Sequence, residues 1–184
     1  MPSKKSTSVP FKEEAPDNPQ ERLKTIGWIV GYVDGEGCFS VTMIRNARTK
    51  FGWQVFPEFV VTQGEKSLNS LKMIQNFFEC GKIFINRRHD NHKEPLFRYC
   101  VRSISDLNAK IIPFFEKNNL KTAKEKDFKV FAKIVKMMIS QRHFKYRGMK
   151  KIAGLMEKIN RCKPSKFLES PETIRQTPQI TEKI

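Results

Sequence analysis

The residues best placed to do chemistry are two carboxylates, Asp34 and Glu36, in the run Asp34-Gly35-Glu36-Gly37. Glycine adopts backbone conformations that other residues avoid, so this run stops a predicted helix and turns the chain. Carboxylate oxygens are the ligands that hard divalent cations prefer in proteins. The sequence therefore places two acids of suitable chemistry at the end of a helix.

Three glycines occupy one face of that helix. Gly27, Gly31 and Gly35 lie four residues apart, so they form a stripe without side chains. Each glycine inside a helix costs about 0.5–1 kcal/mol relative to alanine, so three on one face need a reason. Such a face usually allows the backbone of another helix to come close. Together with the acids, the stripe predicts a site shared between two helices.

The composition indicates a partner with negative charge. The 184 residues have the length of one domain, and 39% hydrophobic residues, 15 of them Phe, are enough to form a core. The net charge of +16 favours binding to a polyanion, most often nucleic acid. A protein with merely solvated, Lys-rich faces is the alternative.

The cysteines and the hydropathy indicate the compartment. The four cysteines (Cys38, Cys80, Cys100 and Cys162) form no CxxC pair, so we interpret them as reduced thiols and not as a zinc site. No apolar run reaches the length of a membrane span, and the N-terminus shows no secretory signal. We therefore expect no membrane partner and an intracellular protein, in a bacterial cytoplasm or an organelle (chloroplast or mitochondrion).

The hydrophobic periodicity predicts an α+β protein. A helix begins at Asn18-Pro19 and ends near Val33, and the order helix–strand–strand then occurs twice. The predicted elements are strands at 38–45 and 53–63, a helix at 67–78, strands at 82–88 and 96–103, and helices starting at Ser105, near 122 and near 149. We expect a flexible arm at 1–18, one domain at 19–162 and a tail at 163–184. Pro57 indicates an edge position or a bulge in its strand.

Alternation along the strands separates an apolar face from a polar one. Val55, Phe59 and Ile85 belong to the predicted buried face, whereas Arg98 and Cys100 belong to the exposed face. Basic and amide side chains can contact bases and phosphates, so this face predicts a DNA-binding sheet, with an ordinary solvated face as the alternative. The candidate DNA-binding residues are Ser40, Thr42, Ile44, Arg45, Asn46, Arg48, Lys50, Gln54, Phe56, Glu58, Thr62, Lys82, Asn86, Arg88, Arg98 and Arg102. The turn His89-Asp90-Asn91-His92 is interpreted as a loop near the DNA backbone, not as a metal site.

The run from Ile29 to Gly37, Ile-Val-Gly-Tyr-Val-Asp-Gly-Glu-Gly, resembles the nine-residue motif of the LAGLIDADG homing endonucleases. Val61-Thr62-Gln63 at a strand end and the connector Asn118-Asn119-Leu120-Lys121-Thr122-Ala123-Lys124 strengthen the resemblance, which covers about residues 20–160. The family implies an αββαββα core with a four-stranded antiparallel saddle that binds DNA, and additional C-terminal helices. Residues 152–160 imitate the motif but have Ile159 and Asn160 in place of its acid and final glycine.

One true motif implies a homodimer that packs through Gly27, Val30, Gly31, Asp34 and Gly35 and binds near-palindromic double-stranded DNA. In the family, the acid at the position of Glu36 binds metal, which implies Mg²⁺ here, with Mn²⁺ or Ca²⁺ able to occupy the site. Asp34 is interpreted as a helix-end or interface acid, with metal binding as the alternative.

The resemblance also implies that Gln63 orients water and that Lys124 or Lys121, of which we favour Lys124, supplies a basic group. It predicts an intron-encoded, site-specific endonuclease that leaves short 3′ overhangs. A nucleic-acid-binding protein without cleavage, an RNA maturase or a regulator, is the alternative.

Overall fold

The computed structural model describes residues 18–86, 95–159 and 165–169. The helices are α1 (Pro19–Glu36), α2 (Leu68–Phe78), α3 (Ile104–Asp106), α4 (Ile112–Lys117), α5 (Lys124–Ile139) and α6 (Tyr146–Met156). The strands are β1 (Gly37–Arg45), β2 (Trp53–Gly64), β3 (Lys82–Asn86) and β4 (Leu96–Val101). Short helical turns occur at η1 (Glu65–Ser67), η2 (Leu107–Ile111) and η3 (Arg142–Phe144). This order confirms the predicted αββαββα core and its additional C-terminal helices.

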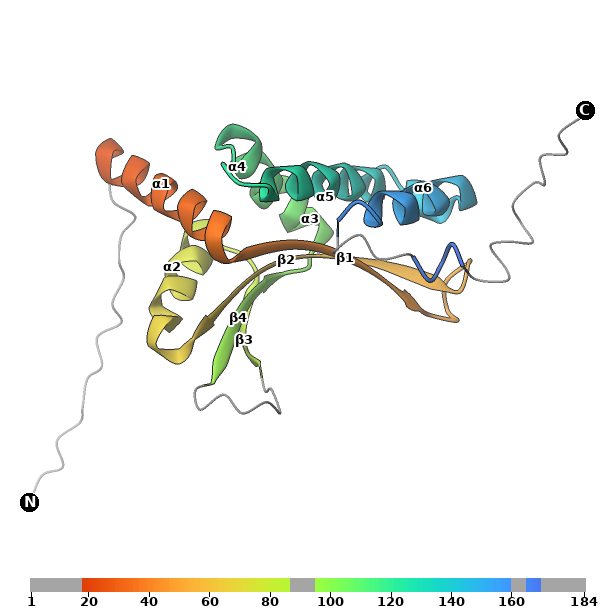
Figure 1. Cartoon of the computed structure of the whole chain (residues 1–184), viewed down its shortest axis with the longest axis horizontal. Helices are drawn as coiled ribbons and strands as arrows, with labels where there is room; N and C mark the ends of the chain where they lie inside the picture. Colours follow the sequence, from red (N-terminus) through yellow and green to blue (C-terminus); the bar gives the residue numbers. More distant parts are fainter. Residues whose placement is uncertain (1–17, 87–94, 160–164, 170–184) are drawn as a thin grey trace, which may run out of the picture.

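The four strands form one antiparallel sheet in the order β1-β2-β4-β3. In Figure 1 the strands curve, and α5 and α6 lie along the upper side of the β1–β2 ribbon, whose underside is uncovered there. Because side chains alternate across a strand, one face of the sheet packs under helices while the other remains accessible. The saddle expected from the sequence is therefore present.

The core between sheet and helices is rich in phenylalanine. Phe39 of β1 stacks on Phe59 of β2 at 5.1 Å between ring centroids. Phe39 also contacts Phe128 and Phe131 of α5, at 5.1 and 5.4 Å, and Phe59 packs edge-on against Phe115 of α4. Edge-to-face and offset aromatic pairs add to the burial of apolar area. This cluster fixes the sheet against the helices and so fixes the end of α1, from which β1 continues.

The predicted start of the first helix is confirmed. The Asn18 side chain accepts a hydrogen bond from the Gln20 N–H at 3.0 Å, and Pro19 occupies the first helical position. The helix predicted to start at Ser105 instead begins at Ile104, where Ser103 is the cap and its Oγ accepts the Asp106 N–H at 3.3 Å. A π-helical turn, η2, precedes Pro113 in α4. Proline lacks an N–H and crowds the preceding turn, which accounts for this local change of helix type.

The strands differ from prediction at three positions. β2 is a central strand, but Pro57 pairs with Val41 of β1 and lies beyond Phe59, where the pairing with β4 ends. The predicted edge position is therefore wrong for β2 as a whole. At Pro57 itself, however, the strand has a neighbour only on its β1 side. Ile85, predicted to be buried, is 56% exposed because β3 is the edge strand. Cys100, predicted to be exposed, is buried.

The expected domain boundaries remain a prediction, although residues 165–169 of the expected tail are packed. Phe167 is buried and meets the Trp53 ring edge-on at 5.9 Å between centroids. Cys38, Cys80 and Cys100 are free thiols, and Cys162 lies outside the described residues. Within the described ranges, no helix is both long and apolar enough to cross a membrane.

Candidate nucleic-acid interface and helix-end site

The end of α1 is shaped by a close contact at Gly37, the first residue of β1. A Cβ added there would lie 2.5 Å from Cγ1 and 2.8 Å from the carbonyl oxygen of Val33. Real Cβ atoms do not come so close to backbone, so only glycine lets the helix pass directly into the strand. Glu36, the last residue of α1, is exposed at this junction.

The Asp34 carboxylate is fully engaged with the connector before α5. Oδ2 accepts the Lys121 N–H at 2.6 Å, and Oδ1 accepts the Thr122 N–H at 3.2 Å and the Thr122 hydroxyl at 2.6 Å. Desolvation raises the pKa of Asp34, but these hydrogen bonds and the charge of Lys124 outweigh it and hold that pKa below its ordinary value. Both oxygens therefore serve to attach the connector to α1.

Lys124 also contacts the end of α1. Its Nζ donates to the carbonyl oxygens of Val33 at 2.9 Å and Gly35 at 3.1 Å. A cation is favourable there because the last carbonyls of a helix have no partner within the helix. Burial lowers the pKa of Lys124, against the opposing effect of nearby acids that include Asp34 and Glu36. The structure thus brings Lys124 to the helix end, whereas the side chain of Lys121 is exposed and its N–H is bonded to Asp34.

Gln63 lies close to the end of α1 by its register in the sheet. Val61 of β2 pairs with Gly37, so Gln63 stands two residues further along, beside the continuation of β1 into α1. It is partly exposed and pairs with Phe97 of β4. Among the described residues, no hydrogen bond joins the Gln63 side chain to Glu36 or Lys124. The predicted role of Gln63 therefore remains a prediction.

The glycine stripe of α1 is open. Gly27, Gly31 and Gly35 are exposed, and a Cβ added at any of them would meet no heavy atom within 4 Å. Nothing in the described part of the chain therefore requires glycine at these positions. Figure 1 shows α1 extending from the end of the sheet, away from α5 and α6. The stripe therefore leaves room for another backbone to come close to this face of α1.

The face of the sheet opposite the helices carries most of the predicted DNA-binding residues. By alternation it contains Ser40, Thr42 and Ile44 of β1, Gln54, Phe56, Glu58 and Thr62 of β2, Lys82 of β3, and Arg98 of β4. Asn86 pairs with Leu96 at the end of β3, and its side chain lies outside the described part of the structure. Arg102 follows β4 and joins this face through Glu58. Arg88 and the turn at 89–92 lie outside the described residues. The structure thus groups side chains from all four strands on one accessible face.

The hairpin between β1 and β2 is held by Asn46. Its Oδ1 accepts the Arg48 N–H at 3.0 Å, and its Nδ2 donates to Gln54 Oε1 at 2.6 Å. Arg48 and Lys50 are exposed at the tip. Arg45 alternates toward the helix side, with its guanidinium 4.4 Å above the Trp53 ring. The structure therefore does not group Arg45 with the other candidates.

Sequence reasoning missed Phe84 on this face. Phe84 of β3 is 47% exposed and pairs with Arg98. Extending the alternation of Lys82 and Asn86 through Phe84 would have found it. An aromatic ring exposed beside an arginine can contact the methyl group of thymine or stack on a base.

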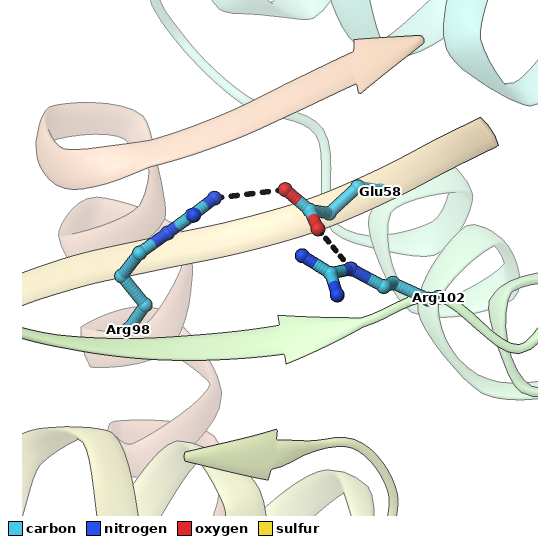
Figure 2. Close-up of polar contacts among 3 residues, drawn as sticks. All are labelled: Glu58, Arg98 and Arg102. Carbon is cyan, nitrogen blue, oxygen red and sulfur yellow. Dashed lines mark hydrogen bonds and ion pairs between the residues drawn. The ribbon is translucent and has the colours of Figure 1, made fainter. Parts of the chain in front are cut away.

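Glu58 joins the two arginines of β4 at the centre of the face. Arg98 Nη2 donates to Glu58 Oε1 at 2.8 Å, and Arg102 Nε donates to Oε2. Figure 2 shows the carboxylate lying between the two guanidinium groups. The hydrogen bond to Glu58 raises the pKa of Arg102, against the effect of desolvation. This network makes Glu58 part of the candidate interface, because it holds two arginines on that face.

Glu36 is the acid whose chemistry fits a divalent cation. Its carboxylate is exposed and makes no hydrogen bond or ion pair with the described residues. No group of three or more His, Cys, Asp or Glu that could hold an ion occurs within the described ranges. Mg²⁺ typically uses one or two protein carboxylates and completes its coordination with waters and substrate phosphates. The single carboxylate of Glu36 that each chain supplies fits such an open site.

Comparison with known proteins gives consistent matches. The model of the LAGLIDADG endonuclease family matches residues 29–135. A probable intron-encoded endonuclease 2 from Neurospora crassa is 37% identical over 133 residues, which are 72% of this chain and 28% of that protein. The chain spans about a quarter of the length of the first curated relatives that it matches.

Solved structures agree with these matches. The homing endonuclease I-TnaI is 39% identical with a TM-score of 0.67, and the alignment covers 73% of this chain and 87% of that chain. I-SmaMI bound to an uncleaved DNA target in the presence of calcium ions is 31% identical with a TM-score of 0.70. That alignment covers 85% of this chain and 52% of that chain.

Proposed function

The chain belongs to the LAGLIDADG endonuclease family, and from that membership we propose that it is a site-specific DNA endonuclease that hydrolyses phosphodiester bonds in both strands. The observation that carries the proposal is the exposed carboxylate of Glu36, which has no partner among the described residues and lies between an open glycine stripe and a basic sheet face. A protein that only binds nucleic acid, such as an RNA maturase or a regulator, would not need this acid. The endonuclease is therefore the better interpretation.

The active unit is a homodimer. The open stripe of Gly27, Gly31 and Gly35 would pack against the same stripe of a second copy across a two-fold axis, with Val30 and Asp34 at its border. Asp34 would contribute by holding the connector in place. Such a contact would bring the two Glu36 carboxylates together and join the two sheets into one saddle. The target is accordingly a long, near-palindromic DNA site.

The Glu36 carboxylates would hold Mg²⁺ together with phosphate oxygens of the DNA, and Mn²⁺ or Ca²⁺ could take the same place. A bound ion would neutralise negative charge on the phosphate and would make a bound water molecule more acidic. Two carboxylates brought together repel each other, which favours a cation between them. The presence of calcium ions with the similar protein I-SmaMI and its uncleaved DNA supports the choice of a hard divalent cation.

Three further side chains assist the chemistry. Lys124, fixed by the carbonyls of Val33 and Gly35, places positive charge beside Glu36 and would stabilise charge that develops on the phosphate. Lys121, exposed on the connector, would add to the attraction for the DNA backbone. Gln63, at the end of β2, would orient a water molecule. Cleavage would leave short 3′ overhangs, as the resemblance implies.

The sheet face would lie in the major groove, where side chains from strands can reach base edges. Arg48 and Lys50 at the hairpin tip would follow the phosphate backbone. We further propose that the protein is intron-encoded, because relatives are named intron-encoded endonucleases. As expected from the sequence, it would act in a bacterial cytoplasm or an organelle.

The decisive experiment exposes a randomised duplex library to the purified chain with Mg²⁺ and, in parallel, with EDTA. We expect cleavage products that share one near-palindromic sequence, formed only with the metal. Glu36→Gln should bind the selected site and leave it uncut. Full cleavage by this variant would remove Glu36 from the mechanism, and binding without cleavage by the wild-type chain would favour the regulator or maturase.

A further inference from the structure

An acid in the middle of a DNA-binding face weakens the attraction for DNA, so its presence there calls for a specific role. Glu58 belongs to β2, the strand flanked by β1 and β4, and faces the same side as Ser40 and Thr62. Its carboxylate reduces the charge of the Arg98–Arg102 pair from +2 to +1. It would also oppose the phosphates electrostatically, because like charges across an interface are repulsive.

Stability gives little reason for this carboxylate. The side chains of Arg98 and Arg102 remain 33% and 58% exposed, and ion pairs with such exposed partners stabilise a fold only slightly. Glu58 itself is only 16% exposed, so its carboxylate is more shielded from solvent than the two guanidinium groups that it joins. This arrangement indicates that the acid holds the arginines while their outer atoms stay accessible.

The hydrogen bonds leave a defined set of donors. Arg102 uses Nε, so both of its terminal Nη groups remain available, and in the described residues they have no acceptor. Arg98 uses Nη2 and retains Nε and Nη1. A guanidinium with a fixed plane and two free N–H groups matches the O6 and N7 acceptors of guanine in the major groove.

We infer that Glu58 is a specificity-determining positioning residue, which orients Arg102, and with it Arg98, toward base edges and prevents them from pairing freely with phosphates. This inference rests on the proposed function, since it concerns the same DNA-binding face. Glu58 increases the preference for the target sequence over other sequences, and it lowers the affinity for DNA of any sequence. Preorganisation of this kind improves recognition because less side-chain freedom is lost on binding.

The test uses three variants of the full chain. Glu58→Asp keeps the charge but is one methylene shorter, so it cannot reach both guanidinium groups in the same geometry. Glu58→Gln removes the charge. Glu79→Gln makes the same change of charge at an exposed residue at the end of α2, and serves as the control. Thermal unfolding would establish that each variant is folded.

Binding is measured by fluorescence anisotropy in Ca²⁺, on the best duplex selected from a randomised library by the wild-type chain and on a duplex of random sequence. We expect Glu58→Asp to lower the affinity ratio of selected to random duplex by about fivefold or more, as for loss of a bidentate base contact. Glu58→Gln should show the same loss. It should also bind random DNA more tightly, with a slope of log K against log salt steeper by about 0.9.

A ratio within twofold of wild type for both Glu58 variants would overturn the inference, as would an equal loss in Glu79→Gln. A loss confined to Glu58→Gln would show that Glu58 acts through its charge and not through positioning, which also overturns it. Absence of any DNA binding by the wild-type chain would instead refute the proposed function. The two failures are therefore distinguishable.

Discussion

Replacing Asp34 by Asn tests the separation of the two motif acids into a structural one and a reactive one. The Asp34 carboxylate accepts three hydrogen bonds from Lys121 and Thr122. Asparagine keeps one acceptor oxygen but turns an NH₂ donor toward one of these donors, so at least one bond is lost. Asp34→Asn should therefore loosen the connector from the end of α1.

The expected magnitude follows from these contacts. A hydrogen bond to a charged group contributes about 1.5–3 kcal/mol when it is buried. Water replaces much of this at a partly exposed site, so we expect a loss of about 1–2 kcal/mol in the free energy of unfolding at pH 7. For a chain of this length, that corresponds to a decrease of about 2–8 °C in Tm. Thermal unfolding followed by the fluorescence of Trp28 and Trp53 measures it.

The pH dependence provides an independent check. The pKa of Asp34 in the folded protein is below its ordinary value of 3.8, so its contribution is fully present above that value. It is lost as the pH falls through the lower, folded-state pKa, and the difference in Tm between wild type and Asp34→Asn should vanish there. Glu36→Gln and Glu79→Gln should keep the wild-type Tm at pH 7. Equal Tm values for wild type and Asp34→Asn would refute the structural role of Asp34.

Four other outcomes are expected. Glu36→Gln should abolish cleavage without weakening DNA binding, as measured by plasmid nicking and anisotropy; residual cleavage near the wild-type rate would contradict this. Gly31→Leu should convert the dimer to a monomer in sedimentation velocity, whereas Gly154→Leu, at an equally open glycine of α6, should leave it intact. Gly37→Ala should destabilise the chain by about 1–3 kcal/mol in urea unfolding, because its Cβ would clash with Val33. Phe59→Ala should cost about 3–5 kcal/mol in the same assay, since Phe59 is fully buried among aromatic rings; a smaller loss would mean that the core repacks.

Local patterns were enough to predict the elements of this fold. The Asn18-Pro19 helix start and the buried face of β2, with Val55 and Phe59, were confirmed, because each depends on neighbours along the chain. Ile85 and Cys100 were wrong because alternation gives the face of a residue but not what covers that face. An edge strand leaves Ile85 open, whereas Cys100 is buried on the face predicted to be exposed.

The candidate site shows the same division. Its residue types and the motif were visible in the sequence, so Glu36, Lys124 and the polar sheet face could be named in advance. The sequence did not show that Asp34 would bind Lys121 and Thr122, or that Lys124 would bind the carbonyls at the end of α1, across about 90 positions of chain. Those contacts depend on how α5 packs against β1 and the end of α1. Nor did it show that Glu58 would hold Arg98 and Arg102.

The sequence by itself determined the family, the αββαββα order and the glycine stripe, because these depend on spacing and on the intrinsic preferences of residues. Only the tertiary structure decided which acid is free within the described part of the chain, which lysine contacts the helix end and which arginines act together. Those outcomes depend on distances between segments remote in sequence. Three hydrogen bonds from the connector assign the Asp34 carboxylate to structure, whereas the exposed Glu36 carboxylate stays available for chemistry.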